Sequence, residues 1–280
     1  MLYSKYHALG NDYIVLNPKD IPSDSLNEEQ IQRICHRNFG IGSDGILLGP
    51  LDGQECEFGL RIFNPDGSEA EKSGNGLRIF SRYLWDNGLV QEKPFSILTA
   101  GGRVESQVFD NGRAVRVEMG NVSFTSNQIP VTGKAREVLN EKIIIAGEEL
   151  IFNAATIGNP HCVIVCDTLS LENVKRLGPL IETNEAFPNR INVQFMQVRD
   201  RHNIQIEIWE RGAGYTLASG SSSSASAAVA HRLGLCDSVV NVHMPGGVIN
   251  IHISDDYFII MTGSVTKVSI GEVSNEIFNN

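Results

Sequence analysis

Two serines, Ser73 and Ser219, stand at matching places in two segments of the chain. Ser73 opens "SGNGLRIF" and Ser219 opens "SGSSSSAS", and each segment continues with a helical pattern that closes on Gly-Leu. The first turn of a helix has unpaired N–H groups and the positive end of the helix dipole, so it binds anions such as a carboxylate. A glycine beside the serine lets a ligand approach the backbone closely. Each segment therefore combines a carboxylate-binding helix start with a reactive hydroxyl group.

The chemistry that suits this pair is the breaking of a C–H bond beside a carboxylate. Such a reaction needs an acid, a base and stabilisation of the anion that forms. If the two helix starts share one cleft, a frequent place for a ligand pocket, Ser73 and Ser219 can act on opposite faces of one substrate. Serine is also a favoured N-cap residue, and from the local sequence alone a capping role is the commoner explanation. The residues themselves leave both roles open.

The elements that must position these serines are mainly strands. Short alternating segments recur, for example "SILTAGGRVESQVF" and "VINIHISDDYFIIM", so β-structure dominates. Helical patterns are fewer, and they comprise "NEEQIQRICHRNFG" and the two segments that begin at the serines. We therefore predict a β-rich chain with a small number of helices.

The chain also reads as a duplication, because its landmarks recur in order. A shift of 146 positions (219 minus 73) aligns "FGLRIFNPDGSEAEKSG" with "IQIEIWERGAGYTLASG" without a gap. "LGNDYIV" pairs with "IGNPHCV" at a shift of 148 (157 minus 9), and "TAGGRV" with "MPGGVI" at a shift of 145 (244 minus 99). We predict two copies of one β-rich unit. The shift of 146 also aligns two strands by the residues expected to face inward. Phe58, Leu60 and Ile62 then align with Ile204, Ile206 and Ile208.

The composition favours a globular protein that acts on a small molecule. Of 280 residues, 41% are hydrophobic and 20% charged, and the net charge of −10 comes without any basic block. That balance argues against binding to nucleic acid or to an anionic membrane. The apolar runs are too short to span a bilayer, and "MLYSKYHALGND" lacks the apolar region of a signal peptide. We expect a cytoplasmic protein.

Cysteine usage predicts neither a disulfide framework nor a metal site. The odd count and irregular spacing do not suit disulfides. "HCVIVC" brings His161 close to two cysteines, but no second ligand pair at zinc-site spacing follows. The better interpretation places Cys162, Ile164 and Cys166 on one face of a buried strand. The five cysteines are Cys35, Cys56, Cys162, Cys166 and Cys236.

Six motifs give the chain a resemblance to the diaminopimelate epimerase family over nearly its whole length. They are "HALGNDYIVL", "GIGSDGIL", "FNPDGSEAEKSGNGLRIFSRYL", "IGNPHCV", "RINVQF" and "ERGAGYTLASG". The resemblance implies an α/β (α+β) fold of two pseudo-symmetric halves, each a curled, mostly antiparallel sheet around a central helix. It places residues 1–118 plus 266–280 in the first half and 119–265 in the second, with the active site in the cleft between them.

The resemblance further implies a cofactor-independent epimerase or racemase acting at the α-carbon of an amino acid. In the family one side chain removes the α-proton and its counterpart protonates the other face, which converts LL- to meso-diaminopimelate for lysine and peptidoglycan precursors. These two positions fall on Ser73 and Ser219, with His161 and Tyr215 in supporting places and neither a cofactor nor a metal required. The matching substrate-binding positions are Asn11, Asn64, Gly74, Asn75, Asn159, Asn192, Glu210, Arg211, Gly220 and Ser221.

The chain departs from the family pattern at the reacting atoms. Both family cysteines are serine here, and a hydroxyl is several pKa units less acidic than a thiol, whose pKa is about 8.5. His161 or Glu210 would then be a candidate to activate a hydroxyl. The family's "GAGET" reads "GAGYT", so Tyr215 replaces a carboxylate that helps to bind the substrate. The serine run extends to Ser224, more than a single exchange would produce, so we interpret it as a natural variant.

Three hypotheses follow from these residues. The first is an epimerase or racemase; the second is another reaction on the same fold, such as β-elimination or a different isomerisation; the third is a catalytically silent amino-acid-binding protein. A small zwitterionic amino acid is the expected ligand in each, and a homodimer is an assembly that the sequence leaves open. Structural roles also fit some residues: turns for Asn11 and Asn159, a surface ion pair for Glu210 with Arg211, and a core position for His161.

Overall fold

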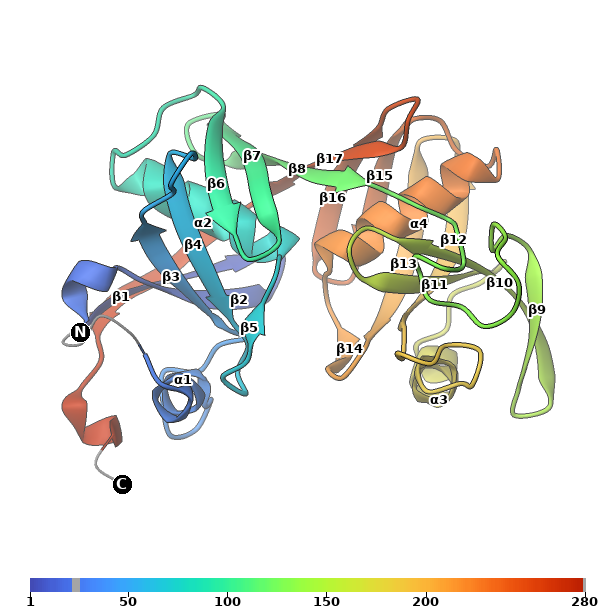
Figure 1. The fold of residues 1–280 in the computed structure, drawn as a ribbon, viewed down its shortest axis with the longest axis horizontal. Coiled ribbons are helices and arrows are strands. Elements are labelled where there is room, and N and C mark those ends of the chain that lie inside the picture. Colours follow the sequence, from blue (N-terminus) through green and yellow to red (C-terminus); the bar gives the residue numbers. More distant parts are fainter. Residues whose placement is uncertain (22–25, 279–280) are drawn as a thin grey trace. The chain divides into compact units, whose positions relative to one another are not determined.

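The computed structural model describes residues 1–21 and 26–278, and the chain divides into two units (Figure 1). Unit 1 comprises Met1–Glu118 and Thr262–Asn280, and unit 2 comprises Met119–Met261. Both boundaries fall inside strands, β8 (Ala114–Asn121) and β17 (Phe258–Ser264). Residues 22–25 and 279–280, which the predicted first half includes, lie outside the described residues.

Unit 1 is built on a mixed sheet. The β1–β2, β3–β4 and β6–β7 pairs are antiparallel, whereas β2–β3 and β4–β6 are parallel. Its elements are β1 (Leu2–Ala8), β2 (Asn11–Leu16), η1 (Pro18–Asp20), α1 (Glu28–Cys35), β3 (Ile46–Leu51), β4 (Phe58–Phe63), β5 (Glu69–Ala70), α2 (Gly74–Asp86), β6 (Phe95–Thr99), β7 (Gly102–Phe109), β18 (Thr266–Glu272) and η2 (Asn275–Phe278).

Unit 2 repeats this scheme. The β10–β11, β12–β13 and β15–β16 pairs are antiparallel, whereas β11–β12 and β13–β15 are parallel. Its elements are β9 (Glu141–Ile145), β10 (Glu148–Thr156), β11 (Pro160–Val165), α3 (Leu171–Glu182), β12 (Asn192–Asp200), β13 (Asn203–Glu210), β14 (Gly214–Thr216), α4 (Gly220–Arg232), β15 (Val239–Met244) and β16 (Gly247–Ile253).

The two units therefore share one topology. In each unit a first helix follows the second strand of the repeat, and a second helix follows a two- or three-residue strand. Helices α2 and α4 both contain 13 residues and begin 146 positions apart, at 74 and 220. The predicted fold class of two similar α/β halves is confirmed.

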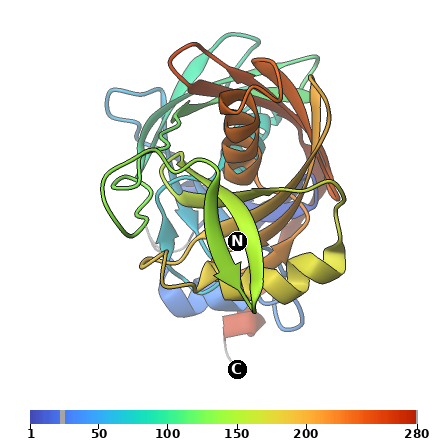
Figure 2. The ribbon, with the colours of Figure 1, turned by 90° about the vertical axis from the view of Figure 1, so that its right-hand side faces the viewer.

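Helices α2 and α4 are the central elements of their units. Helix α2 packs against β1, β2, β3 and β7, and α4 packs against strands on both sides of unit 2, including β10, β12 and β16. Figure 2 shows α4, in orange, against the strands of its unit. Buried residues at helical spacing, Leu77, Phe80 and Leu84, explain why α2 is held there. Helix α2 ends where Gly88 takes a positive φ of 68°, and Leu89 N–H then bonds to the Leu84 carbonyl at 3.0 Å.

The strand alignment predicted for the two copies holds for five of six residues. Ile204, Ile206 and Ile208 are fully buried, and Leu60 and Ile62 are at most 3% exposed. The expectation for Phe58 was wrong, because it is the first residue of β4 and is only partly buried. Its ring instead makes an edge contact with Phe95, with centroids 5.9 Å apart.

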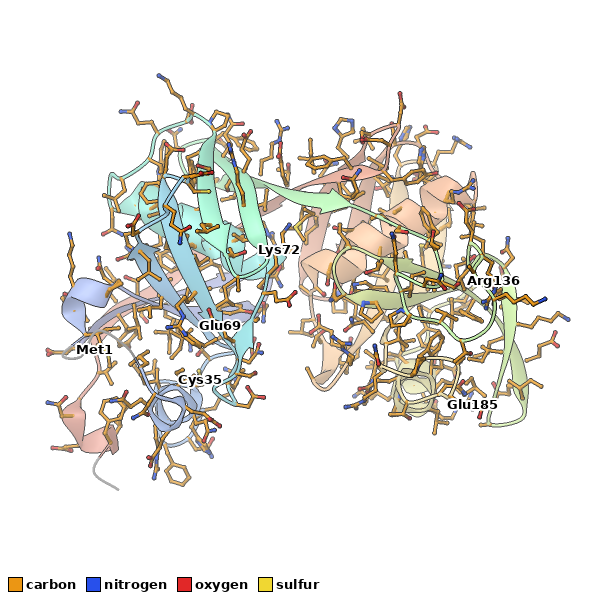
Figure 3. All side chains as sticks on the ribbon, viewed as in Figure 1. Met1, Cys35, Glu69, Lys72, Arg136 and Glu185 are labelled. Atoms are coloured by element: carbon orange, nitrogen blue, oxygen red, sulfur yellow. The ribbon has the colours of Figure 1, made fainter. Side chains whose placement is uncertain are left out.

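The predicted first helix and the cysteine strand are both present. Asn27 caps α1 in a capping box with Gln30, and Cys35 ends the helix (Figure 3). Cys162 and Ile164 pack into the core of unit 2, with Cys166 partly buried against the same cluster. Burial raises the pKa of the Cys162 thiol, as expected for an unreactive core cysteine.

In residues 1–21 and 26–278 no three or more His, Cys, Asp or Glu side chains gather as metal ligands would. Among the helices of these residues, none is long and apolar enough to cross a membrane.

Candidate functional site

Ser73 is the N-cap of α2, and its hydroxyl group has two close neighbours. Its backbone is extended (φ −138°, ψ 116°), so Oγ turns back over the helix and accepts the Gly76 N–H at 3.0 Å. The Tyr13 hydroxyl lies 3.2 Å from the same Oγ, and either atom can donate. A Cβ at Gly76 would come within 3.0 Å of Leu47 and 3.3 Å of Ser73 Oγ, so the glycine keeps this start of the helix from being crowded.

Next to Ser73, the amides of Asn75 and Asn11 are held in one orientation. Arg78 Nη2 donates to Asn75 Oδ1 at 2.5 Å, and Asn75 Nδ2 donates to Asn11 Oδ1 at 2.9 Å. Asn11 Nδ2 then donates to Asp44 Oδ2 at 2.9 Å. Because each amide donates in the same direction, the buried cation at Arg78 and the carboxylate of Asp44 fix both side chains. The structure thus brings two predicted site residues into direct contact.

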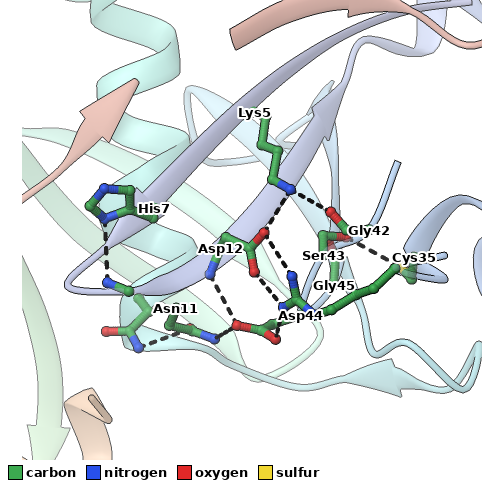
Figure 4. A network of polar contacts seen from close by, with 12 residues as sticks. Lys5, His7, Asn11, Asp12, Cys35, Gly42, Ser43, Asp44 and Gly45 are labelled. Atoms are coloured by element: carbon green, nitrogen blue, oxygen red, sulfur yellow. Dashed lines mark hydrogen bonds and ion pairs between the residues drawn. The ribbon is translucent and has the colours of Figure 1, made fainter. Parts of the chain in front are cut away.

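A cluster of charges supports this chain of amides from the outer side (Figure 4). Arg37 Nη2 lies 2.7 Å from Asp12 Oδ1 and 2.6 Å from Asp44 Oδ1, and Lys5 Nζ lies 2.9 Å from Asp12 Oδ2. Burial raises the pKa of Asp12, but the hydrogen bonds from Arg37 and Lys5 outweigh it and leave that pKa below its usual value. Asn11 is therefore anchored to Asp44, which is itself held in place by its ion pair with Arg37.

Asn64, also predicted to bind substrate, braces the turn between β4 and β5. Its backbone N–H donates to the Ser68 carbonyl at 2.8 Å, and its Nδ2 donates to Ser68 Oγ at 3.0 Å. These bonds hold the segment that leads from β4 to Lys72, the residue before Ser73 (Figure 3). Lys72 Nζ reaches the Glu118 carbonyl at 3.4 Å.

In unit 2, Ser219 caps α4 as Ser73 caps α2. Its Oγ accepts the Ser222 N–H at 3.4 Å and lies 3.5 Å from Ser221 Oγ. Asn159 Nδ2 donates to Ser221 Oγ at 3.3 Å, and Asn159 Oδ1 lies 3.0 Å from His161 Nε2. Four predicted site residues therefore form one chain of hydrogen-bonded groups: Ser219, Ser221, Asn159 and His161.

His161 is fully buried and neutral. Burial lowers its pKa to about 3, the Gln194 side chain acts in the opposite direction, and the charge of Arg211 lowers the pKa further. Because Asn159 uses Nδ2 to donate to Ser221, its Oδ1 must accept, so His161 carries its proton on Nε2. The buried Nδ1 atom has no partner among the described residues. His161 is thus linked to Ser219 through Asn159 and Ser221, and it orients Asn159 directly.

The remaining predicted residues of unit 2 surround the end of β13. Asn192 Nδ2 donates to the Pro160 carbonyl and its Oδ1 accepts the Arg211 N–H, both at 2.9 Å, so it joins β11 to this turn. The exposed Arg211 side chain donates to the Asn189 carbonyl at 3.1 Å. Glu210 ends β13, and its carbonyl accepts the Ala213 N–H at 3.2 Å.

Tyr215, at the position where the resemblance implies a carboxylate, has a hydroxyl group that already bonds within unit 2. Its hydroxyl donates to Glu207 Oε2 at 2.7 Å, and Lys175 Nζ lies 5.5 Å from its ring centre. Burial and the contact with Glu207 raise the pKa of Tyr215 to about 12. Tyr215 therefore stays neutral at physiological pH.

Two residues that contact the predicted site were missed at the sequence level. Tyr13 reaches Ser73, and Gln194 Nε2 donates to Ser222 Oγ at 3.0 Å beneath the start of α4. A signal for Tyr13 was present, because it lies two positions after Asn11 on one strand and therefore shares its face. Gln194 sits inside the motif "RINVQF", where a buried polar residue in an apolar strand indicated a specific partner.

Comparison with known proteins places these motifs in context. Residues 3–125 and 153–268 match the family model for diaminopimelate epimerase. The chain is 66% identical over 278 residues to "Diaminopimelate epimerase 2" of Nostoc sp. strain PCC 7120, which covers 99% of this chain and 97% of that protein. It is 36% identical to the diaminopimelate epimerase of Alkaliphilus metalliredigens, with 98% of each chain covered.

Solved structures show the same fold at low sequence identity. A probable proline racemase from Agrobacterium radiobacter K84 matches with a TM-score of 0.69 at 16% identity, covering 99% of this chain and 94% of that chain. A hydroxyproline epimerase from Agrobacterium vitis gives the same TM-score and identity, with 98% and 92% covered.

Proposed function

Because the chain belongs to the diaminopimelate epimerase family, we propose that it inverts the α-carbon of diaminopimelate, converting the LL form to the meso form. The observation that carries this proposal is the 66% identity to a diaminopimelate epimerase along almost the full length of both chains. The two matching helix starts, each capped by a serine and followed by a buried glycine, support it.

We infer that the substrate α-carboxylate binds to the N–H groups of the two helix starts. The first turn of a helix presents backbone N–H groups that an anion can accept, and the dipole of a 13-residue helix favours an anion at this end. The glycines after the serines leave room for a ligand against the backbone. The carboxylate would then be held by the N–H groups of Gly74, Asn75, Gly220 and Ser221.

We further propose that both units contribute to one active site, with Ser73 and Ser219 on opposite faces of the α-carbon. One serine, as its alkoxide, accepts the α-proton and becomes a hydroxyl, while the other hydroxyl delivers its proton to the opposite face and becomes the alkoxide, so the configuration inverts. The N–H groups and dipoles of the helix starts stabilise the negative charge that spreads from the α-carbon onto the bound carboxylate. Asn11, Asn64, Asn159, Asn192, Glu210 and Arg211 would bind the rest of the amino acid, with His161 and Tyr215 in supporting positions.

The charge state of Tyr215 bears on the substrate. A neutral phenol offers the distal ammonium group of diaminopimelate a weaker partner than a carboxylate does. We therefore expect diaminopimelate to bind less tightly here than to a protein with glutamate at this position. Changing Tyr215→Glu should lower KM for diaminopimelate.

The test is deuterium uptake from heavy water at the α-carbon of LL- and meso-diaminopimelate, with a panel of other amino acids alongside. We expect uptake together with interconversion of the two forms, and loss of both in Ser73→Ala and Ser219→Ala. Absence of exchange with every amino acid would refute an epimerase, and release of water or ammonia would indicate elimination instead. Light scattering in the same buffer tests whether the protein forms a homodimer, an assembly that the sequence leaves open.

A further inference from the structure

The Tyr13 hydroxyl lies 3.2 Å from Ser73 Oγ, and no part of the function proposed above uses it. Tyr13 is only 7% exposed, and its ring packs directly on Gly45, where a Cβ would come within 2.6 Å of Cε1. The backbone of Gly45 therefore leaves the space that the ring occupies. This packing fixes the direction in which the Tyr13 hydroxyl points.

We propose that Tyr13 is a positioning residue that exchanges a proton with Ser73 and so lets an alcohol act in place of a thiol. The proposal rests on the function proposed above, in which Ser73 exchanges a proton with the α-carbon. A phenol has a pKa of about 10, which lies between that of a thiol and the higher value of an alcohol. Charge that would otherwise remain on a serine oxygen can then pass to a more acidic group.

The contacts of Ser73 Oγ suit such a relay. A hydroxyl oxygen has two lone pairs and one hydrogen. The Gly76 N–H occupies one lone pair at 3.0 Å, and the Tyr13 O–H can occupy the other at 3.2 Å. The hydrogen of Ser73 is then directed away from the protein groups, toward a substrate held at the start of α2.

The proton transfer balances in both directions. When Ser73 acts as the acid, its O–H bond breaks as a C–H bond forms at the α-carbon, while the Tyr13 O–H bond breaks and a new Ser73 O–H bond forms. The electron pair of the broken phenol bond stays on Tyr13 as a phenolate. When Ser73 acts as the base, the same four bonds change in reverse, and Tyr13 regains its proton.

Other groups on this face of unit 1 titrate at high pH and must be separated from Tyr13. Tyr6 lies directly opposite Tyr13 in the β1–β2 register, and burial together with its bond to Asp86 raises its pKa. Burial lowers the pKa of Arg78 to about 10. The other charged or titratable side chains on the adjoining elements β1, β2, α2 and the segment before β3 are Tyr3, Lys5, His7, Asp12, His36, Arg37, Asp44, Arg82, Tyr83 and Asp86.

The first test is Tyr13→Phe, which removes the hydroxyl and keeps the ring. We expect kcat for α-proton exchange to fall about 100-fold, within the range of proton-transfer catalysis, with KM changed less than about threefold. Tyr6→Phe is the matched control, because it removes a buried hydroxyl from the neighbouring strand, and its rate should stay within about twofold of the unchanged protein. A full rate in Tyr13→Phe would overturn the proposal.

The second test separates a relay from a structural role. In a Ser73→Cys background the thiolate forms near neutrality without help, so Tyr13→Phe should then cost less than about fivefold. An equal loss in the serine and cysteine backgrounds would overturn the relay, because a packing defect does not depend on the acidity of residue 73.

A third test identifies Tyr13 in the pH profile. Replacing Tyr13 by a fluorinated tyrosine of lower pKa should move the alkaline limb of kcat down by the difference between the two phenols, whereas Tyr6 and Arg78 are untouched. An unmoved limb would contradict the proposal. If the unaltered protein exchanges no amino acid at all, the proposed function itself fails; if it exchanges and Tyr13→Phe is unimpaired, the relay alone fails.

Discussion

The two helix starts share a backbone design but are supported by different chemistry. At α2, Ser73 contacts the phenol of Tyr13, and the neighbouring Asn75 is linked through Asn11 to the charged groups Asp44 and Arg37. At α4, Ser219 contacts Ser221, which leads through Asn159 to a neutral His161. Both units keep a serine cap at this helix start, whereas the groups behind the caps differ. Ser73 and Ser219 therefore have different hydrogen-bonded neighbours, and we expect removal of those neighbours to affect activity and stability differently in the two units.

The interiors of the two helices differ in the same way. Helix α2 buries large apolar residues and the cation Arg78, while α4 buries mainly alanine and serine. Two of the buried serines of α4 bond to the preceding turn of the same helix: Ser223 donates to the Ser219 carbonyl and Ser224 to the Gly220 carbonyl, both at 2.8 Å. Small side chains at these positions let the strands of unit 2 pack close to the α4 backbone.

The strongest way to test the equivalence of the two serines is to convert both to cysteine. A thiolate forms several pKa units more easily than an alkoxide, so Ser73→Cys with Ser219→Cys should raise the exchange rate by about 10³-fold or more. The single variants should differ, with Ser219→Cys giving the larger gain because Ser73 already has a phenol beside it. Stopped exchange assays on the three variants measure this, and a lower rate in the double variant would show that thiols do not fit.

The next effect is the pH dependence of stability in unit 2. The pKa of His161 is about 3 when folded against about 6.5 when unfolded, so the unfolded chain binds a proton first as the pH falls. The unfolding free energy that neutral His161 contributes is complete above pH ~6.5 and is lost progressively between pH ~6.5 and pH ~3. At pH 5 the loss amounts to about 2 kcal/mol. Urea unfolding between pH 5 and 8 should show this slope, and His161→Gln should flatten it.

A charged group beside the candidate site in unit 1, Asp12, titrates at lower pH. The pKa of Asp12 is depressed in the folded state, so its contribution is complete above the unfolded value of about 3.9 and is lost only as the pH falls below it. Asp12→Asn should therefore leave the slope between pH 5 and 8 unchanged. If Asp12→Asn rather than His161→Gln flattened the pH dependence of the unfolding free energy, the assignment of that dependence to His161 would be wrong.

A third comparison replaces one asparagine in each unit, Asn159 in unit 2 and Asn11 in unit 1. Asn159→Ala leaves the buried Nε2–H of His161 without its acceptor and should cost about 1–3 kcal/mol of unfolding free energy. Asn11→Ala leaves Asp44 paired with Arg37 and should cost less stability, about 1 kcal/mol. We expect Asn11→Ala to raise KM instead, because Nδ2 of Asn75 loses its acceptor, Asn11 Oδ1, and the Asn75 amide is then held less firmly. Urea unfolding and substrate titration of both variants distinguish the two losses.

The smallest expected effect compares one serine in each helix. Ser226 in α4 is fully buried with an Oγ that has no partner among the described residues, so Ser226→Ala should be neutral or stabilise by up to about 1 kcal/mol. Ser81 in α2 donates to the Leu77 carbonyl at 2.8 Å and lies 2.7 Å from Ser106 Oγ. Ser81→Ala should therefore destabilise by about 1 kcal/mol. Shifts of the thermal unfolding midpoint in opposite directions for Ser226→Ala and Ser81→Ala would support this difference, and equal losses of stability in both variants would contradict it.

Much of the fold could be read from local patterns because they are repeated. The Ser-Gly openings mark the starts of α2 and α4, since a cap and its helix are set by neighbouring residues. Alternation along residues 203–210 marked the buried face of β13 correctly. The same reasoning failed for Phe58, because burial at the first residue of a strand depends on what lies beyond the strand end.

The sequence by itself determined the family, the two-copy architecture and the positions of Ser73 and Ser219, because each depends on spacing along one chain. Only the tertiary structure decided what supports these residues. That Tyr13 reaches Ser73 across 60 positions, and that His161 is neutral and bonded to Asn159, are consequences of strand register and burial. Acidity follows from surroundings in space, and those surroundings exist only once the strands of each unit have paired around its helix.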